Sequence, residues 1–551
     1  MLSRDGRTGV VFNGCIYNFR AIRTELEARG HQFHSQCDTE ILVEGYLEWG
    51  IDGLLPRLHG MFAFAIWDDV KRVLFLARDR LGVKPLIYRI SNGNLEFASN
   101  LQALLAAGGS RDLDPQAVMD YLDFGFVTDT RCIVLGVDKL APATVLEWRD
   151  GKATVRQYWD LPPFGEAKNT TFENAVDEAE ELLLEAVRLR LVSDVPIGAL
   201  LSGGIDSTLV CWALSKLNTD VRAFTVGTPG DAEDESADAS AIARQLGIQH
   251  EIVAIDTNEA APMEELGNAY GEPFASTSAL GVLRVSRAVR RKATVLLTGD
   301  GGDDVFLGYP IFRNAWTAQK IAKIVPGFVA GMWPTLRPLV SAFPALKRPR
   351  SLLDYSLGGI GPYAGVRDGL PWFAERGMLG EKLRGLTVAH REIAPSFESA
   401  QRILADVFQF HRRMHFTSEF MPKVDGGTTH HSLEARAPLL DQKLWEFAVQ
   451  LPPEIQFHGG QMKAVLREIV RRRVGPDVAF RRKRGFSIPV EKWLAAKWSG
   501  QLQALKRPNV LTREGWFDAK ALGKAVDDGL RDKSVAAQLW YLLVLENWMR
   551  R

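Results

Sequence analysis

The sequence predicts two domains, a sheet-rich α+β domain followed by an α/β domain that is built on a parallel sheet. Short β-rich runs alternate with turn residues from Val10 to about residue 160. From about residue 175, apolar strand patterns alternate with amphipathic helices, which is typical of a parallel sheet covered on both faces. From Ile311 onward the patterns are mostly helical, so we expect a helical C-terminal part. The predicted domains are residues 1–160 and 161–551.

The first domain is expected to contain several short strands and an early helix. Strands are predicted at residues 10–12, 61–67 and 73–76, each followed by polar turn residues. A helix is predicted at residues 19–29. Residues 161–166 contain two prolines and a glycine, so they are expected to form the linker to the second domain.

The second domain is predicted to begin with a helix, because alanine and leucine recur at helical spacing between positions 175 and 189. A buried strand at residues 196–201 then leads into a helix, and a second strand at residues 221–226 leads into another. A third strand at residues 295–297 ends in a turn rich in glycine and aspartate. Parallel sheets of this kind bind ligands at the carboxyl ends of their strands, so the turns that follow them are candidate sites.

Composition excludes several classes of protein. The 551 residues contain 67 Lys and Arg against 67 Asp and Glu, so no basic excess favours nucleic acid as a partner. The 4 cysteines form no C-x-x-C pair, which argues against a zinc ribbon or a disulfide scaffold and favours a cytoplasmic location. The apolar stretch at residues 321–344 is interrupted by Lys323, Arg337 and prolines, so no membrane span is expected.

Two turns at strand ends carry the strongest chemical signal. S-G-G-I-D-S at residues 202–207 follows an apolar strand and opens a helix, where glycines and free backbone N–H groups can hold phosphate oxygens. It lacks the lysine of a Walker A loop. T-G-D-G-G-D-D at residues 298–304 adds carboxylates that suit Mg²⁺. Each turn alone is also compatible with a polar turn that binds no ligand, but the two together favour a metal-bound triphosphate.

Five motifs in order resemble the glutamine-hydrolysing asparagine synthetases of the bacterial type. They are S-G-G-I-D-S, T-G-D-G-G-D-D-V-F-L-G-Y at 298–309, H-S-L-E-A-R-A-P-L-L-D at 431–441, K-A-V-L-R at 463–467 and R-R-K-R-G-F-S-I-P at 481–489. The resemblance covers essentially the whole chain. It implies an ATP pyrophosphatase domain that adenylates the side-chain carboxylate of aspartate, releases pyrophosphate, and lets ammonia displace AMP.

The resemblance also implies roles for individual residues. Asp300 and Lys463 match the family's catalytic carboxylate and its phosphate-neutralising lysine, and Asp206 and Asp303 match its magnesium ligands. The residues that would hold ATP are Leu201, Ser202, Gly203, Gly204, Asp206, Ser207, Val226, Thr298 and Gly299. ATP with Mg²⁺, aspartate, and glutamine or ammonia are therefore the expected substrates, and a homodimer is an open alternative for the assembly.

The first domain resembles the N-terminal-nucleophile glutaminase of these amidotransferases. Asn13 and Gly14 would form the oxyanion hole, and Asp38 would bind the α-amino group of glutamine. Cys15 and Asn100 stand where the family usually has glutamate.

The glutaminase nucleophile is an N-terminal cysteine whose own amine acts as base, but this sequence starts Met-Leu, so we expect no glutamine hydrolysis by it. We expect Met1 to be an internal methionine of a longer first domain. The alternative is a shortened enzyme that uses free ammonia.

Other assignments stay open. Related synthetases without a working N-terminal cysteine form lactams or other amides on different carboxylates, and a non-catalytic nucleotide-binding descendant is a further alternative. The basic clusters at 471–473 and 481–484 are interpreted as solvated surface, with a pyrophosphate-side role for part of them. Gly359 to Gly365 has the wrong spacing for a dinucleotide loop. The adjacent His430 and His431 match no metal-binding spacing and are interpreted as structural.

Overall fold

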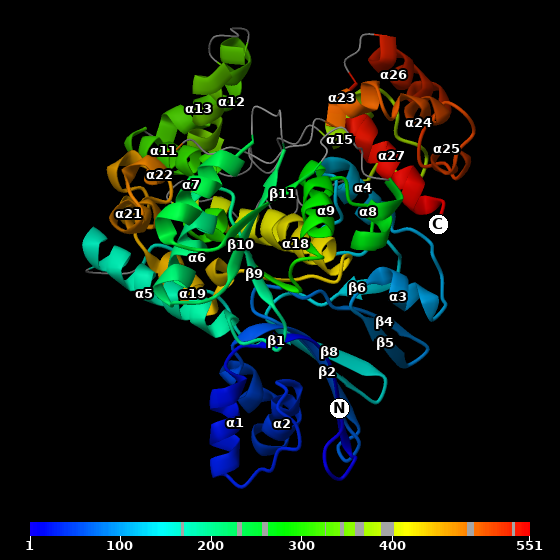
Figure 1. Ribbon diagram of the computed structural model, residues 1–551. Coiled ribbons are helices and arrows are strands. Elements are labelled where there is room, and N and C mark those ends of the chain that lie inside the picture. Colours follow the sequence, from blue (N-terminus) through cyan, green and yellow to red (C-terminus); the bar gives the residue numbers. More distant parts are fainter. Residues whose placement is uncertain are drawn as a thin grey trace.

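The structure is a computed structural model of the chain, and its backbone is shown in Figure 1. It describes residues 1–166, 170–228, 234–255, 263–325, 327–341, 347–358, 369–386, 402–481, 490–531 and 535–551. Residues 359–365, whose spacing is wrong for a dinucleotide loop, and most of the motif at 481–489 lie outside the described residues.

An antiparallel five-stranded sheet forms the lower part of the molecule in Figure 1. Its strands, in spatial order, are β1 (Thr8–Ile16), β2 (Gly60–Asp68), β3 (Val73–Arg78), β7 (Thr144–Arg149) and β8 (Lys152–Gln157). Helices α1 (Phe19–Ala28) and α2 (Thr39–Leu54) cover one face, where they pack on Phe62 and Phe64 of β2. Ala63 and Ala65 belong to a separate cluster with Leu146, since successive side chains of a strand point to opposite faces.

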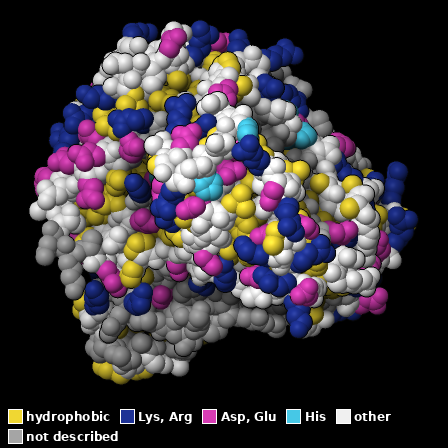
Figure 2. All heavy atoms as spheres, turned by 90° about the horizontal axis from the view of Figure 1, so that it is seen from below, with side chains coloured by type: hydrophobic (Ala, Val, Ile, Leu, Met, Phe, Trp, Pro, Cys, Tyr) yellow, Lys and Arg dark blue, Asp and Glu magenta, His cyan; other side chains and the backbone are white. Residues whose placement is uncertain are grey.

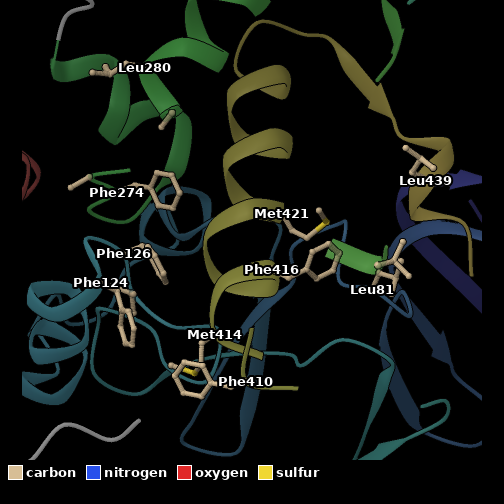
Figure 3. Close-up of a cluster of buried hydrophobic side chains, with 14 of the residues drawn as sticks. Leu81, Phe124, Phe126, Phe274, Leu280, Phe410, Met414, Phe416, Met421 and Leu439 are labelled. Atoms are coloured by element: carbon tan, nitrogen blue, oxygen red, sulfur yellow. The ribbon is translucent and has the colours of Figure 1, made fainter. Parts of the chain in front are cut away.

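A smaller sheet joins this domain to the main core. It consists of β5 (Asn94–Ala98), β4 (Ile87–Ser91) and β6 (Val137–Lys139) in spatial order. Helices α3 (Leu101–Ala106) and α4 (Pro115–Phe124) lie between β5 and β6 along the chain. Phe124 and Phe126 lie in one apolar cluster with Phe274 and Met414 of the second half, as Figure 3 shows. The largest hydrophobic core therefore contains residues of both halves.

A parallel five-stranded sheet organises the second half. The spatial order is β11 (His250–Ala254), β10 (Arg222–Gly227), β9 (Ile197–Leu200), β12 (Val295–Leu297) and β13 (Glu434–Arg436). The chain moves outward from β9 to β10 and β11, and then returns to the other side of β9 to form β12 and β13. Such a reversal opens a crevice at the carboxyl ends of the two central strands, β9 and β12.

Helices surround the parallel sheet and form the C-terminal part, which confirms the predicted fold class. The helices near the sheet are α5 (Phe172–Arg190), α6 (Ile205–Lys216), α7 (Ser236–Leu246), α8 (Met263–Tyr270), α9 (Thr277–Val289) and α10 (Gly302–Val305). Next along the chain come α11 (Pro310–Ile324), α12 (Gly327–Ser341), α13 (Lys347–Gly358), α15 (Leu370–Glu375), α17 (Ile403–His411), a π-helix (Arg412–Phe420), α18 (Met421–Thr429), α19 (Gln442–Gln450), α20 (Pro453–Gln456), α21 (Ala464–Arg473), α22 (Pro476–Ala479), α23 (Val490–Ala495), α24 (Ser499–Ala504), α25 (Val510–Arg513), α26 (Ala519–Arg531) and α27 (Ala537–Met549). Short 3₁₀ helices lie at Leu55–Arg57, Pro438–Leu440 and His458–Gly460.

Two expectations from the sequence concern membrane spans and surface charge. Within the described residues, the helices are all too short or too polar to cross a membrane. Figure 2 shows Lys and Arg interspersed with Asp and Glu on the face that it presents, rather than gathered by sign. This mixture agrees with the zero net charge of the sequence.

A buried carboxylate fastens the two halves to each other. Asp441 Oδ2 lies 2.6 Å from Nε2 of His59 in the first half and accepts a 3.0 Å hydrogen bond from Arg190 of α5. Its other oxygen accepts from the backbone N–H of Lys443 and caps α19. Burial opposes ionisation of Asp441, but His59 and Arg190 outweigh it and lower the pKa of the carboxyl.

We expect Asp441→Asn to lower the free energy of unfolding by about 3 kcal/mol, because Arg190 and His59 would lose a buried anionic partner. Urea denaturation followed by circular dichroism measures the change. Asp160→Asn is the control, since Asp160 is largely exposed and its ion pair with Arg412 is 3.4 Å long; a change within about 0.5 kcal/mol is expected there. Equal effects of the two substitutions would contradict the role of Asp441.

Candidate active site

The turn after β9 forms a polar cradle at the start of α6. Gly203 has a φ of 76°, a conformation that glycine adopts without strain. The backbone N–H of Ser202 donates to Oγ of Ser207 over 3.1 Å, and the two hydroxyl oxygens lie 3.0 Å apart. Leu201 is fixed by a 2.9 Å hydrogen bond from its N–H to the carbonyl of Phe224 on β10. Ser202 and Gly204 of this turn are exposed.

The turn after the neighbouring strand β12 presses directly on this cradle. A Cβ on Gly299 would lie 2.6 Å from the backbone nitrogen of Ser207, so only glycine permits the approach. Thr298 donates its hydroxyl to Oδ2 of Asp300 over 2.7 Å. Burial raises the pKa of the Asp300 carboxyl above its ordinary value. The two turns at these adjacent strand ends therefore lie directly against each other.

Lys463 links the two turns electrostatically. Its Nζ lies 2.5 Å from Oδ2 of Asp206 and 2.7 Å from Oδ1 of Asp303. Burial acts to lower the pKa of Lys463, but the two carboxylates outweigh it and raise the pKa, so the ammonium stays charged. The residue has a φ of 55°, which is uncommon outside glycine and costs about 1 kcal/mol or more. This conformation places Lys463 immediately before the first turn of α21.

The predicted residues line two adjoining cavities. The larger cavity, of about 370 Å³, is lined by Leu201, Asp206, Ser207, Val226, Thr298, Gly299 and Asp300. The smaller, of about 140 Å³, is lined by Gly203, Asp303 and Lys463. Ser202, Gly204 and Glu235 border both cavities. The structure therefore brings together all the residues that the sequence assigned to ATP and to catalysis.

The smaller cavity also contains two arginines. Arg467 and Arg481 both line it. Nη1 of Arg481 is buried, and among the described residues no hydrogen-bond acceptor faces it. Guanidinium groups in this arrangement suit the oxygens of a phosphate. From the sequence, part of the basic clusters at 471–473 and 481–484 was assigned to pyrophosphate. Arg467 was missed, although the K-A-V-L-R motif contains it, and so was Glu235, which lies in no motif.

The donor set around Lys463 fits a Mg²⁺ ion bound together with phosphate. Asp206 and Asp303 offer hard carboxylate oxygens that both face one point, the position of the Lys463 ammonium. The space beside them has no room for further side chains, because a Cβ on Gly302 would lie 2.4 Å from Oδ1 of Asp206. A Cβ on Gly308 would lie 2.1 Å from Oδ1 of Asp303.

The residues assigned to glutamine gather at the end of β1. Gly14 approaches β2 so closely that a Cβ would lie 2.1 Å from the carbonyl oxygen of Met61. Asn13 donates to the Ser99 hydroxyl over 3.3 Å, and Asp38 accepts from the N–H of Ile16 over 2.9 Å. The structure brings Asp38 to the end of β1.

Cys15 and Asn100, which stand where the family usually has glutamate, lie in different surroundings. The thiol of Cys15 is partly buried, and burial raises its pKa to about 12. A thiol in that state is a poor nucleophile. The side chain of Asn100 caps α3 by accepting from the N–H of Ala103 over 2.8 Å. Asn100 and Asn13 both line a cavity of about 280 Å³ between the halves, which Tyr270 and His430 of the second half also line.

Comparison with known proteins first defines the class. Residues 1–159 match the model of the glutamine amidotransferase domain, and residues 178–550 match the model of asparagine synthase. The chain is therefore an enzyme of the ligase type with an amidotransferase domain in front. Because the second match spans well over half of the chain, the protein belongs to the asparagine synthase family.

Relatives align over nearly the whole chain. Asparagine synthetase [glutamine-hydrolyzing] 1 of Bacillus subtilis is 27% identical over 98% of this chain and 85% of its own length. A putative asparagine synthetase of Mycobacterium tuberculosis is 29% identical over 98% of this chain and 84% of its own length. Amidase chry2 of Gibberella zeae is 27% identical over 95% of this chain and 83% of its own length.

We expect Gly308→Ala to weaken the binding of ATP and Mg²⁺ at least about tenfold, because a misplacement of about 1 Å in such a site is costly. The new Cβ would lie 2.3 Å from Cε of Lys463. Isothermal titration calorimetry with ATP and Mg²⁺ measures the change. Gly523→Ala is the control, since no atom lies within 4 Å of a Cβ there. Unchanged affinity in Gly308→Ala would rule out the described packing.

Alkylation tests the state of the cysteines. In the native protein we expect iodoacetamide to modify Cys37, which is exposed, and to leave Cys15 unmodified. Mass spectrometry of tryptic peptides gives both rates, and denatured protein, in which all four cysteines of the sequence should react, is the reference. If Cys15 reacts as fast as Cys37, its thiol is not suppressed as described.

Proposed function

We propose that the protein converts aspartate into asparagine at the expense of ATP. The side-chain carboxylate of aspartate attacks the α-phosphorus of ATP, the bond to the β-phosphate breaks, and pyrophosphate leaves. Ammonia then attacks the activated carbonyl carbon, a proton is lost from nitrogen, and AMP leaves. The family membership supports this reaction, and the single observation that carries it is Lys463 bridging Asp206 and Asp303 between two strand-end turns.

In the adenylation step, the cradle of Ser202, Gly203, Gly204 and Ser207 would hold phosphate oxygens, with the start of α6 directed at them. Lys463 would neutralise the charge that develops on the transferring phosphorus and on pyrophosphate. Arg467 and Arg481 would hold the leaving pyrophosphate, and their place in the lining of the same small cavity supports this role. Leu201, Val226, Thr298 and Gly299 would contact the nucleoside in the larger cavity.

Mg²⁺ would be held by Asp206 and Asp303 and, when bound, would supply charge neutralisation to the triphosphate. The Lys463 ammonium is paired with both carboxylates, so it compensates part of their charge.

In the amidation step, Asp300 would accept the proton that the attacking ammonia loses. It lines the larger cavity, and its hydrogen bond from Thr298 fixes one carboxylate oxygen. A carboxylate whose pKa is raised by burial is a better proton acceptor than an ordinary one.

The first half would serve nitrogen delivery. Asn13 and Gly14 at the end of β1 match the oxyanion hole of the glutaminases that this half resembles, and Asp38 matches the residue that binds the glutamine α-amino group. Ammonia itself is the nitrogen donor that we propose for this chain. We further propose that residues 1–160 and 161–551 are the two functional domains. Assembly as a homodimer and a cytoplasmic location belong to the same proposal. The location rests on the cysteine content of the sequence.

We expect Lys463→Ala and Asp300→Asn to reduce ammonia-dependent asparagine formation at least about 100-fold, because each would remove a group that acts in the transition state. Lys463→Ala should also reduce aspartate-dependent ATP–pyrophosphate exchange. Lys506→Ala is the matched control, since its ion pair is on the surface. Residual activity near wild type in Lys463→Ala would contradict the proposed role.

The same exchange assay tests the substrate. Wild type should exchange pyrophosphate with aspartate and not with glutamate or a β-amino acid. Because one relative is named an amidase, other carboxylates are a specific second candidate. Exchange with another acid and none with aspartate would overturn the assignment of aspartate while keeping the adenylating chemistry.

A further inference from the structure

Three side chains that the proposed reaction does not use meet between α8 and the end of α18. Glu265 of α8 and the adjacent His430 and His431 present one ligand atom each, and these atoms all lie within 4.8 Å of one another. Nε2 of His431 is 3.1 Å from Oε1 of Glu265, and Nε2 of His430 is 3.9 Å from the same oxygen. The two imidazole rings are nearly perpendicular, at 71°, with centroids 4.9 Å apart.

We propose that Glu265, His430 and His431 form a binding site for a divalent transition-metal ion of the zinc type. Two imidazoles and one carboxylate are a ligand set that Zn²⁺ accepts, with the fourth position left for water. Zinc bonds of about 2.1 Å in a tetrahedron separate the ligand atoms by about 3.4 Å. The observed 3.1 and 3.9 Å lie on either side of that value, so small side-chain rotations would close the site.

The state of His431 supports a metal rather than an ordinary ion pair. Its Nε2 is buried and has no hydrogen-bond partner in the described part of the chain, although Oε1 of Glu265 is near. A close nitrogen and oxygen that make no aligned hydrogen bond are expected where a cation would lie between them.

The surrounding structure brings the three ligands together. Two glycines precede the histidines in α18: a Cβ on Gly426 would lie 2.7 Å from the Tyr270 ring, and one on Gly427 would lie 2.7 Å from Val282. Larger residues would push α18 away from α8 and α9, and with it the histidine pair from Glu265. Ser432, with a φ of 55°, turns the chain away directly after His431.

Arg287 of α9 fixes the carboxylate without blocking it. Its guanidinium donates to Oε2 of Glu265 over 2.5 Å and leaves Oε1 toward the histidines. Such outer contacts orient metal ligands in many sites. The Arg287 side chain is 47% exposed, so solvent and salt screen its repulsion of a bound cation.

The site lies at the edge of the space between the two halves. His430 lines the inter-domain cavity of about 280 Å³, together with Asn268 of α8 and Thr429 of α18. A metal held by His430 would therefore have its remaining position near that cavity. It would also tie α8 to α18, two elements that carry cavity-lining residues.

The test uses the full chain, stripped of metal with a chelator and kept in excess Mg²⁺ so that the nucleotide site is not counted. Titration with Zn²⁺ against a chromophoric indicator should give one site per chain. His430→Gln, His431→Gln and Glu265→Gln should each weaken that site at least about tenfold. His34→Ala and Cys37→Ser, which change exposed residues, should leave it unchanged.

Two further measurements keep the proposal falsifiable if a variant is unstable. Co²⁺ bound to wild type should give the intense visible bands of a four-coordinate ion, and Zn²⁺ should raise the melting temperature of wild type more than that of the variants. Absence of a one-to-one site in wild type, or a Zn²⁺ affinity equal to that of wild type in all three ligand variants, would overturn the proposal.

Discussion

The position of Asp441 is the constraint on which the arrangement of the two halves depends. It holds His59 and Arg190, and it ends the segment Pro438–Leu440. A Cβ on Gly301 would lie only 2.4 Å from Leu440, so this segment packs directly under the turn that carries Asp300 and Asp303. One buried carboxylate therefore sets both the docking of the first half and the position of the acidic turn.

Charge compensation is the second organising feature of the site. Three buried or half-buried charges, on Asp206, Asp303 and Lys463, lie in direct contact. An isolated charge in such a place would be costly, and the group is tolerated because each member is paired. The left-handed backbone of Lys463 adds a further cost at the same point. Strain and concentrated charge at one location are typical of a site that is built to bind and release a charged substrate.

The sequence predicts the parts of this site that local pattern controls and misses those that depend on distant contacts. The cradle at Ser202 and the acidic turn at Asp300 follow apolar strands, so their place at strand ends could be inferred. Strand β13 was not predicted, because Glu434–Arg436 is only three residues long and polar, and it forms by pairing with β12. The approach of Glu265 to the histidine pair depends on how α8, α9 and α18 pack, which no periodicity in the sequence encodes.

The shared core of Phe124, Phe126 and Phe274 has a consequence for how such enzymes can be recombined. A glutaminase half taken from one relative and joined to the synthetase half of another would replace only one side of a close-packed surface. Exchange would succeed only if the small sheet, α4 and their partners in the second half were inherited together. The segment that has to be exchanged as one piece in this architecture is therefore larger than either half alone.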